Sequence, residues 1–253
     1  MKGMLFPKNL IILACFIPLL SHAQLSLGIE GGVNKNYLST SGIQQAFTSY
    51  TGAYGAQVAI PVSYRLKNWL SVQSSISYVQ KNYNIVRTGF FEGIHQNNKN
   101  NYIQVPLMAH FSFGGKKMRG FLNLGGYGAY WVSATVQGTE PNILNPVDSS
   151  FTTSQQPVND FSLSKPYSFN EKYTFDSRKD CRWEWGLLAG VGLSYQLSQS
   201  VVMYVEGRFT QSLTDQQKNY MINQVGRYNQ TYAVLAGAMV PVKIFCKKKA
   251  KKE

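Results

Sequence analysis

The chain has 253 residues and a formal net charge of +13, although charged residues make up only 15% of it. Such a charge is typical of nucleic-acid binding, but much of the excess comes from one terminal lysine run, residues 247–252. We interpret that run as a solvated tail near anionic headgroups and expect no nucleic-acid partner. No linker-like boundary separates two compositionally different halves, so we expect one domain.

The first residues have the pattern of a secretory signal peptide. Two lysines precede an apolar run over residues 10–20, and Ala23 ends the short stretch that signal peptidase reads. We predict cleavage before Gln24, so that residues 1–23 are removed and the mature chain is exported. An alternative places a lipid on Cys15, but the chain stays apolar after this cysteine, where a polar tether is expected.

Apolar and polar residues alternate in eight later segments. A period of two places successive side chains on opposite faces of a β-strand. The segment near residues 182–197 carries a longer apolar face than a typical soluble strand of about five or six residues displays. The predicted strands lie near residues 25–38, 52–66, 69–86, 101–113, 119–137, 182–197, 201–212 and 230–245.

Short and long connections alternate between these strands, and this regularity indicates the fold. Outer-membrane barrels have short turns in the periplasm and long loops outside the cell, whereas no segment after the signal reaches the roughly 18 apolar residues of a membrane helix. We predict an all-β fold, an eight-stranded antiparallel up-and-down transmembrane β-barrel over residues 24–246. It is expected in a Gram-negative outer membrane, in contact with its lipids, with residues 247–253 as a basic periplasmic tail.

Aromatic residues on the apolar face fall into two bands, as bilayer interfaces favour. The predicted girdle at the loop end contains Tyr54, Trp183 and Tyr232, and the one at the turn end contains Tyr64, Phe111, Phe113, Tyr195 and Phe245.

Three prolines lie inside predicted strands, at Pro61, Pro106 and Pro241. A closed barrel has no free edge, and proline removes a ladder N–H. We therefore expect local bulges at these positions.

The inward face is polar and charged. Eight strands enclose a lumen just wide enough for side chains, which argues against a general diffusion pore. Buried charges need partners, so we predict a paired polar filling; the alternative is a small-ligand or proton-linked site. The predicted lumen network is Glu30, Arg65, His110, Glu184, Glu206 and Arg208, accompanied by Gln57, Gln73, Lys81, Gln104 and Asn123.

No catalytic, cofactor-binding or metal site is expected. His95 with Glu92 and a neighbouring serine would form a triad, but nothing in the sequence fixes a serine beside this histidine. There is no CxxC pair, HExxH helix or acidic loop with ligand spacing. Cys181 and Cys246 are expected at opposite ends of the barrel, which excludes a disulfide between them.

The longest predicted loop spans residues 138–181. Loops of this length are uncommon without a function, and its aromatic residues have two interpretations. They contact a protein or glycan partner, or they fold down over the barrel mouth. These residues are Phe151, Phe161, Tyr167, Phe169, Tyr173 and Phe175.

Three strand sequences and the signal ending in Ala23-Gln24 resemble the Bacteroidetes outer-membrane β-barrel family often labelled PorT-like. These sequences are YIQVPLMAHF (102–111), FLNLGGYGAYW (121–131) and WEWGLLAGVGLSY (183–195). The resemblance implies a porin-like eight-stranded barrel. Because the family's namesake is tied to the type IX secretion machinery, it also implies a secretion-related role, but it transfers no functional residue. One departure is the lysine tail after Phe245, since many outer-membrane barrels end on an aromatic residue.

These observations lead to one favoured function and two alternatives. The favoured hypothesis is a non-enzymatic barrel that acts as a binding or secretion-accessory component. The alternatives are a lipid-modifying enzyme at the outer leaflet and a narrow channel for small solutes.

Overall fold

The protein is described by a computed structural model, which covers residues 25–41, 47–89, 93–140, 167–198, 200–222 and 224–242. The predicted signal peptide, the basic tail, Phe245 and Cys246 lie outside these residues. The strands are β1 (Leu25–Ser41), β2 (Thr48–Lys67), β3 (Leu70–Gln80), β4 (Tyr83–Arg87), β5 (His95–Gly114), β6 (Met118–Glu140), β7 (Tyr167–Lys172), β8 (Trp183–Ser198), β9 (Val201–Ser212) and β10 (Gly226–Val242). Within the same ranges, no helix has the length and apolarity needed to cross a membrane.

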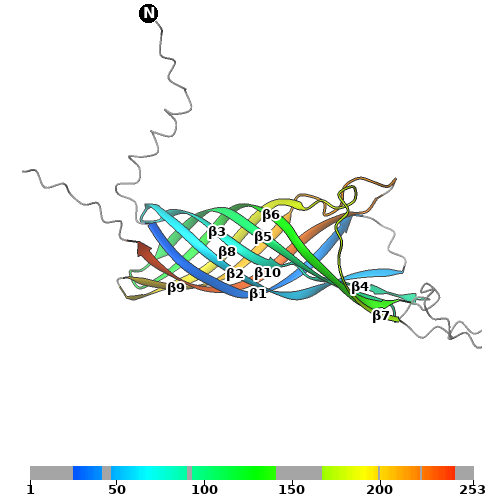
Figure 1. Cartoon of the computed structure of the whole chain (residues 1–253). Coiled ribbons are helices and arrows are strands. Elements are labelled where there is room, and N and C mark those ends of the chain that lie inside the picture. The colour runs from blue at the N-terminus through cyan, green and yellow to red at the C-terminus, as the bar shows by residue number, and fades with distance from the viewer. Residues whose placement is uncertain are drawn as a thin grey trace, which may run out of the picture.

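Eight strands close into a ring (Figure 1). They pair antiparallel in the order β1, β2, β3, β5, β6, β8, β9 and β10, and β10 closes on β1 from Leu25↔Val242 to Ser41↔Gly226. This confirms the predicted eight-stranded up-and-down barrel. The third predicted strand, 69–86, is interrupted at Lys81 and Asn82, so that β3 and β4 pair with successive parts of β2.

Side chains alternate between the outside and the lumen. Along β2, Val58 and Ile60 are more than half exposed while Gln57 and Ala59 are buried. The outward positions of the other ring strands carry similarly exposed apolar side chains, which a bilayer covers and water does not. The polar residues are therefore inside and the apolar ones outside, the reverse of a soluble core.

The prolines do not produce the predicted bulges. Pro61 stays in register with Ser75 of β3, Pro106 with Tyr127 of β6, and Pro241 with Ser26 of β1. Each proline also faces a second neighbouring strand, β1 for Pro61 and β3 for Pro106. Two register pairs are missing from each of these ladders, and the pairing then resumes in the same register. The missing N–H is thus accommodated by a local gap in one ladder. The register shifts occur elsewhere, at Arg65/Lys67, Asn101/Tyr102 and Gln196/Ser198.

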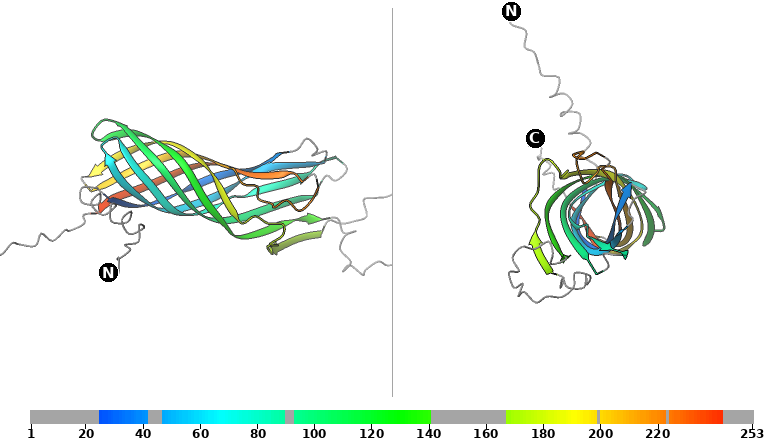
Figure 2. Two further views of the ribbon diagram at one scale, coloured as in Figure 1. Left: turned by 90° about the horizontal axis from the view of Figure 1, so that it is seen from above. Right: turned by 90° about the vertical axis from the view of Figure 1, so that its right-hand side faces the viewer.

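The two ends of the barrel differ in construction (Figures 1 and 2). At one end short turns join β2 to β3 and β5 to β6. In the second of these turns Gly114 has a φ of 115°, in the left-handed region that favours glycine. The paired residues Leu25 and Val242 lie at this same end.

At the opposite end the wall continues beyond the ring (Figure 2). β6 runs on to Glu140 and pairs there with β7, past Tyr130↔Trp183, the last register pair of β6 with β8. The predicted loop 138–181 therefore begins later than expected and contains a strand. His95, predicted in a loop, is the first residue of β5.

Candidate functional site

A buried ionic network occupies the part of the lumen nearer the short turns. Arg208 on β9 donates from Nη1 and Nη2 to the two oxygens of Glu30 at 3.0 and 3.1 Å. Its Nε and Nη2 also reach Glu206 at 2.9 and 2.7 Å, and the Tyr204 hydroxyl donates to Glu30 at 2.8 Å. We call Glu30, Tyr204, Glu206 and Arg208 the lower network. One guanidinium fork serves both carboxylates, which is the geometry that makes a buried charge tolerable.

Gly190 makes room for this network. It pairs with Arg208 across the β8–β9 ladder, and a Cβ built on it would lie 2.1 Å from Glu206 Oε1. A side chain at position 190 would therefore displace the carboxylate that Arg208 holds. Glycine avoids this displacement.

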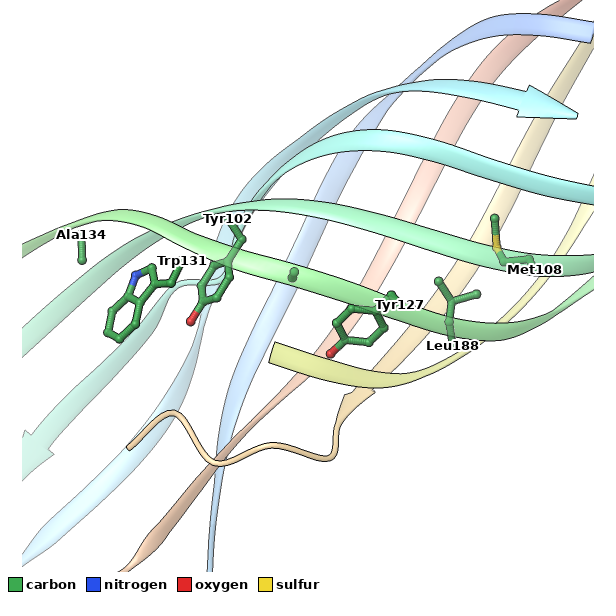
Figure 3. Packing of buried hydrophobic residues seen from close by; sticks show 7 residues of the cluster. Tyr102, Met108, Tyr127, Trp131, Ala134 and Leu188 are labelled. Carbon is green, nitrogen blue, oxygen red and sulfur yellow. The ribbon is translucent and has the colours of Figure 1, made fainter. Parts of the chain in front are cut away.

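A cluster of buried apolar and aromatic side chains lies along the lumen (Figure 3). Met108 and Leu188 are almost fully buried, and Tyr127, Tyr102 and Trp131 follow in turn toward the long-loop end. The lumen is thus filled by apolar as well as polar side chains.

The second group, which we call the upper network, centres on Glu184 of β8. Lys81 Nζ and the Tyr127 hydroxyl donate to Glu184 Oε1 at 2.6 and 2.7 Å, and Asn229 Nδ2 donates to Oε2 at 2.7 Å. Lys81 is fully buried, and its ammonium group lies 4.6 Å from the Tyr127 ring centroid and 5.1 Å from that of Tyr102. Carboxylate acceptors and aromatic faces together replace the water that the ammonium loses.

Aromatic rings cover the upper network at the barrel mouth. Trp131 stacks with Tyr102 and with Tyr173 at ring-centroid distances of 5.9 and 5.8 Å, and Phe175 makes a T-shaped contact with it at 4.9 Å. The long-loop aromatic residues were expected either to contact a partner or to fold down over the barrel mouth. Tyr173 and Phe175 do the latter and pack against the aromatic cluster in the mouth. Phe151 and Phe161 lie outside the described residues.

The chain segments before β8 and after β9 form a roof over these rings. Asp180 and Gln217 form an isolated bridge, and Cys181 N donates to Gln216 O at 3.0 Å. Tyr173 donates its hydroxyl to Asp180 at 2.9 Å. Burial, with a further contribution from this carboxylate, raises the pKa of the Tyr173 hydroxyl. The roof encloses a pocket of about 80 Å³ between β4, β5, β6 and β10.

The predicted lumen residues separate into three sets. Glu30, Glu206 and Arg208 meet in the lower network, and Glu184 lies in the upper one. His110 joins neither: it is partly buried, with Nδ1 2.7 Å from Asn123 Oδ1 and its ring against Phe121. Arg65 is exposed near the short turns, so placing it in the buried network was wrong. Position 65 lies two residues before the end of β2, where the strand has reached the rim of the lumen.

The triad that the sequence analysis set aside is not assembled by the described residues either. His95 is exposed, and its Nδ1 lies 3.1 Å from the hydroxyl of Thr139, a threonine on β6. Glu92 falls outside the described residues. Nowhere in the described ranges do three or more His, Cys, Asp or Glu side chains gather as metal ligands would. Cys181 is a free thiol. The absence of a disulfide bond between Cys181 and Cys246 stays a prediction, because Cys246 lies outside the described residues.

The predicted girdle residues point outward. Tyr54, Trp183 and Tyr232 are half or more exposed at the long-loop end, and Phe113 and Tyr195 are similarly exposed at the other. Tyr64 and Phe111 are half-buried. Lys35 lies 5.2 Å from the ring centroids of both Tyr37 and Tyr54. Such a cation on aromatic rings suits the headgroup level.

The sequence reasoning missed the aromatic members of the lumen. On β5, Tyr102 is two residues from Gln104 and points to the same inward face. On β6, Tyr127 and Trp131 are an even number of residues from Asn123 and also point inward. The alternation that located the amides therefore also located these rings. The roof left no such signal, because its contacts join residues 173–182 to residues 213–222 without any periodic pattern.

Comparison with known proteins agrees with this architecture. Residues 21–217 match the family model described as outer membrane protein beta-barrel domain. OprG from Pseudomonas aeruginosa is 13% identical, with a TM-score of 0.46 over 87% of this chain and 98% of that chain. The Neisserial surface protein NspA is 12% identical, with a TM-score of 0.40 over 85% and 97% of the two chains. Ail from Yersinia pestis is 13% identical, with a TM-score of 0.38 over 85% and 99%. A search of curated proteins found no match.

Proposed function

Because this chain belongs to the outer membrane protein β-barrel domain family and is an outer-membrane protein, we propose that it is a closed, non-enzymatic barrel that binds a partner at its extracellular end. The observation that carries this proposal is the filling of the lumen by buried, paired side chains. The lower network, the upper network and the cluster of buried apolar and aromatic side chains all lie inside the barrel.

The filling supports a closed barrel because its charges satisfy one another. Each carboxylate of the two networks accepts two or more hydrogen bonds from within the lumen. Removing such groups from their partners costs several kcal/mol, so the side chains have little tendency to swing aside for a solute. The networks consequently act as structural plugs.

The extracellular end supports binding because it is built beyond what crossing the bilayer requires. β4, β7 and the upper part of β6 extend the wall past the outward aromatic residues, and the roof holds two loop segments together. The segment after β9 exposes apolar side chains there: Leu213, Tyr220, Met221 and Ile222. Apolar groups exposed to water on an ordered segment are typical of a contact surface.

Conductance in planar bilayers tests the closed lumen. The wild-type protein is expected to give no stable ion steps of porin size, because the buried side chains of the two networks hydrogen-bond to one another inside the lumen. Steps of that size from protein with heat-modifiable gel migration would overturn the proposal. A triple variant, Glu30→Ala with Glu206→Ala and Arg208→Ala, removes the lower network and shows what leakage through a thinned filling looks like.

Site-specific cross-linking in cells tests which end binds. A photo-reactive residue at position 220 probes the extracellular segment, and one at position 116 probes the β5–β6 turn. Adducts at position 220 with none at 116 are expected. The reverse pattern would contradict extracellular binding and favour the secretion-accessory role, including the type IX connection that the PorT-like resemblance implies.

A further inference from the structure

The pocket under the roof has walls from six chain segments. Its floor and sides come from Asn98 and Asn100 on β5 and Trp131 on β6, with Tyr83 on β4 and Arg227 on β10. The roof contributes Tyr173, Asp180, Gln216 and Gln217. A volume of about 80 Å³ is several times the space that one water needs. The site has room for a small polar group.

Three residues of the pocket walls carry a buried hydrogen-bond donor that has no partner among the residues that the structure describes. They are Asn98 Nδ2, Trp131 Nε1 and Arg227 Nε. Asn98 and Trp131 are more than nine-tenths buried. A buried donor without an acceptor costs about 1–3 kcal/mol, and buried polar groups in native proteins are nearly always paired. Three donors on one small pocket therefore indicate an acceptor-rich ligand.

Two other polar groups of the pocket, Asp180 and Gln216, are already engaged. Asp180 accepts from the Tyr173 hydroxyl at 2.9 Å and from Asp176 N at 2.7 Å, so both its oxygens are hydrogen-bonded within the roof. Gln216 Nε2 donates to the Tyr102 hydroxyl at 3.1 Å. Asp180 consequently holds the roof, and the N–H groups, with the Arg227 charge, define what the pocket recognises.

Trp131 presents an unpaired N–H on a ring that is already in stacking contacts. Tyr102 and Tyr173 stack with its indole at centroid distances of 5.9 and 5.8 Å. The indole N–H has no partner among the described residues. The pocket is therefore suited to an oxygen acceptor.

The walls are held in place before any ligand arrives. Trp131 N donates to Arg182 O at 2.8 Å, Gln216 N donates to Arg227 O at 2.9 Å, and Arg227 N donates to Asp215 Oδ1 at 3.0 Å. A preformed site binds without a large ordering cost. Lys179 and Lys218 also stand on the roof, where Lys179 Nζ lies 3.9 Å from the Asp176 carboxylate and Lys218 Nζ donates to Ser177 O at 2.9 Å.

We propose that this pocket binds a carboxylate group, with Arg227, Trp131 and Asn98 as its donors. The inference rests on the proposed function, because it names the chemistry recognised at the extracellular end. A carboxylate has two oxygens and about four acceptor positions, enough for all three donors. Its source is either an acidic saccharide or a free small organic acid.

Isothermal titration of the full-length protein in detergent distinguishes these sources. The probes are galacturonate, its uncharged counterpart galactose, and acetate. Saturable binding of galacturonate at least tenfold tighter than galactose is expected. Acetate of comparable affinity assigns the site to small acids, whereas much weaker acetate assigns it to acidic saccharides. Galactose binding as well as galacturonate, or neither carboxylate binding, overturns the proposal.

Two substitutions identify the pocket as the binding site. Trp131→Phe keeps a ring between Tyr102 and Tyr173 but removes the N–H, and should weaken binding about tenfold, since a hydrogen bond to a charged group is lost. Arg227→Gln should weaken it by at least as much. Lys99→Gln is the matched control, because it removes a positive charge from an exposed residue adjacent to Asn98, and should change binding less than twofold.

Unchanged binding in both Trp131→Phe and Arg227→Gln would refute the pocket as the site. The proposed function would survive that outcome if the barrel stays closed and cross-links at position 220 persist. Porin-sized conductance, by contrast, would refute the proposed function whatever the titrations show.

Discussion

The lower network and the pocket under the roof each contain an arginine, but the two arginines are paired differently. Arg208 is buried and donates four hydrogen bonds to two carboxylates. Arg227 is half-buried, and neither its Nε nor Trp131 Nε1 of the same pocket has an acceptor among the described residues.

This difference separates a structural site from a binding site. Where all donors and acceptors are matched internally, a ligand has nothing to offer, and the group's contribution goes to stability. Where donors stay unmatched, the protein gives up stability that a ligand restores. Substitutions in the lower network should therefore change unfolding, and substitutions in the pocket should change binding.

The largest effect is expected for Arg208→Met. The substitution leaves Glu30 and Glu206 buried without their guanidinium and should lower the free energy of unfolding by about 3–5 kcal/mol. Urea unfolding of the barrel in lipid vesicles, followed by tryptophan fluorescence, measures this. Adding Glu30→Gln and Glu206→Gln should recover at least half of the loss, and a failure to recover would mean that packing and not charge dominates.

A smaller loss is expected for Lys81→Met. Glu184 would lose the ammonium but keep the Tyr127 hydroxyl and Asn229 as donors, so we expect about 2–3 kcal/mol. The same unfolding experiment measures it. A loss as large as that of Arg208→Met would show that the neutral donors contribute little to the upper network.

Tyr173→Phe should cost about 1 kcal/mol, because it removes one hydrogen bond, to Asp180, and keeps the ring on Trp131. Hydrogen exchange of the roof amides, such as Cys181 N and Lys218 N, is the more sensitive measurement. Faster exchange confined to the roof is expected. Faster exchange throughout the barrel would contradict a local role.

The smallest stability effect is expected for Arg227→Gln, within about 0.5 kcal/mol of wild type, as for substitutions that break no internal pair. The same variant should lose most of its carboxylate binding. A large drop in stability would place Arg227 with Arg208 as a structural residue and would remove the contrast between the two regions.

Much of the lumen was predictable from particular residues. Glu30, Glu184, Glu206 and Arg208 occupy the polar phase of strongly alternating strands, so a period of two was enough to turn them inward. Arg65 is also at an inward position of the alternation, but it lies where its strand leaves the lumen. The alternation shows to which face a side chain points, and it does not show how far along the barrel axis the residue lies. The prolines were located correctly, but whether a ladder bulges or skips a pair depends on the neighbouring strands.

By itself, the sequence determined the number of ring strands, the order of short and long connections, and which face of each strand is apolar. These follow from local periodicity, because a β-strand fixes side-chain direction residue by residue. Only the tertiary structure decided which buried charges meet, since Glu30 and Arg208 are 178 positions apart and their levels depend on the stagger of the closed barrel. The tertiary structure also determined the roof and its pocket. Their contacts join irregular segments, whose sequences have no periodic pattern from which the contacts could be predicted.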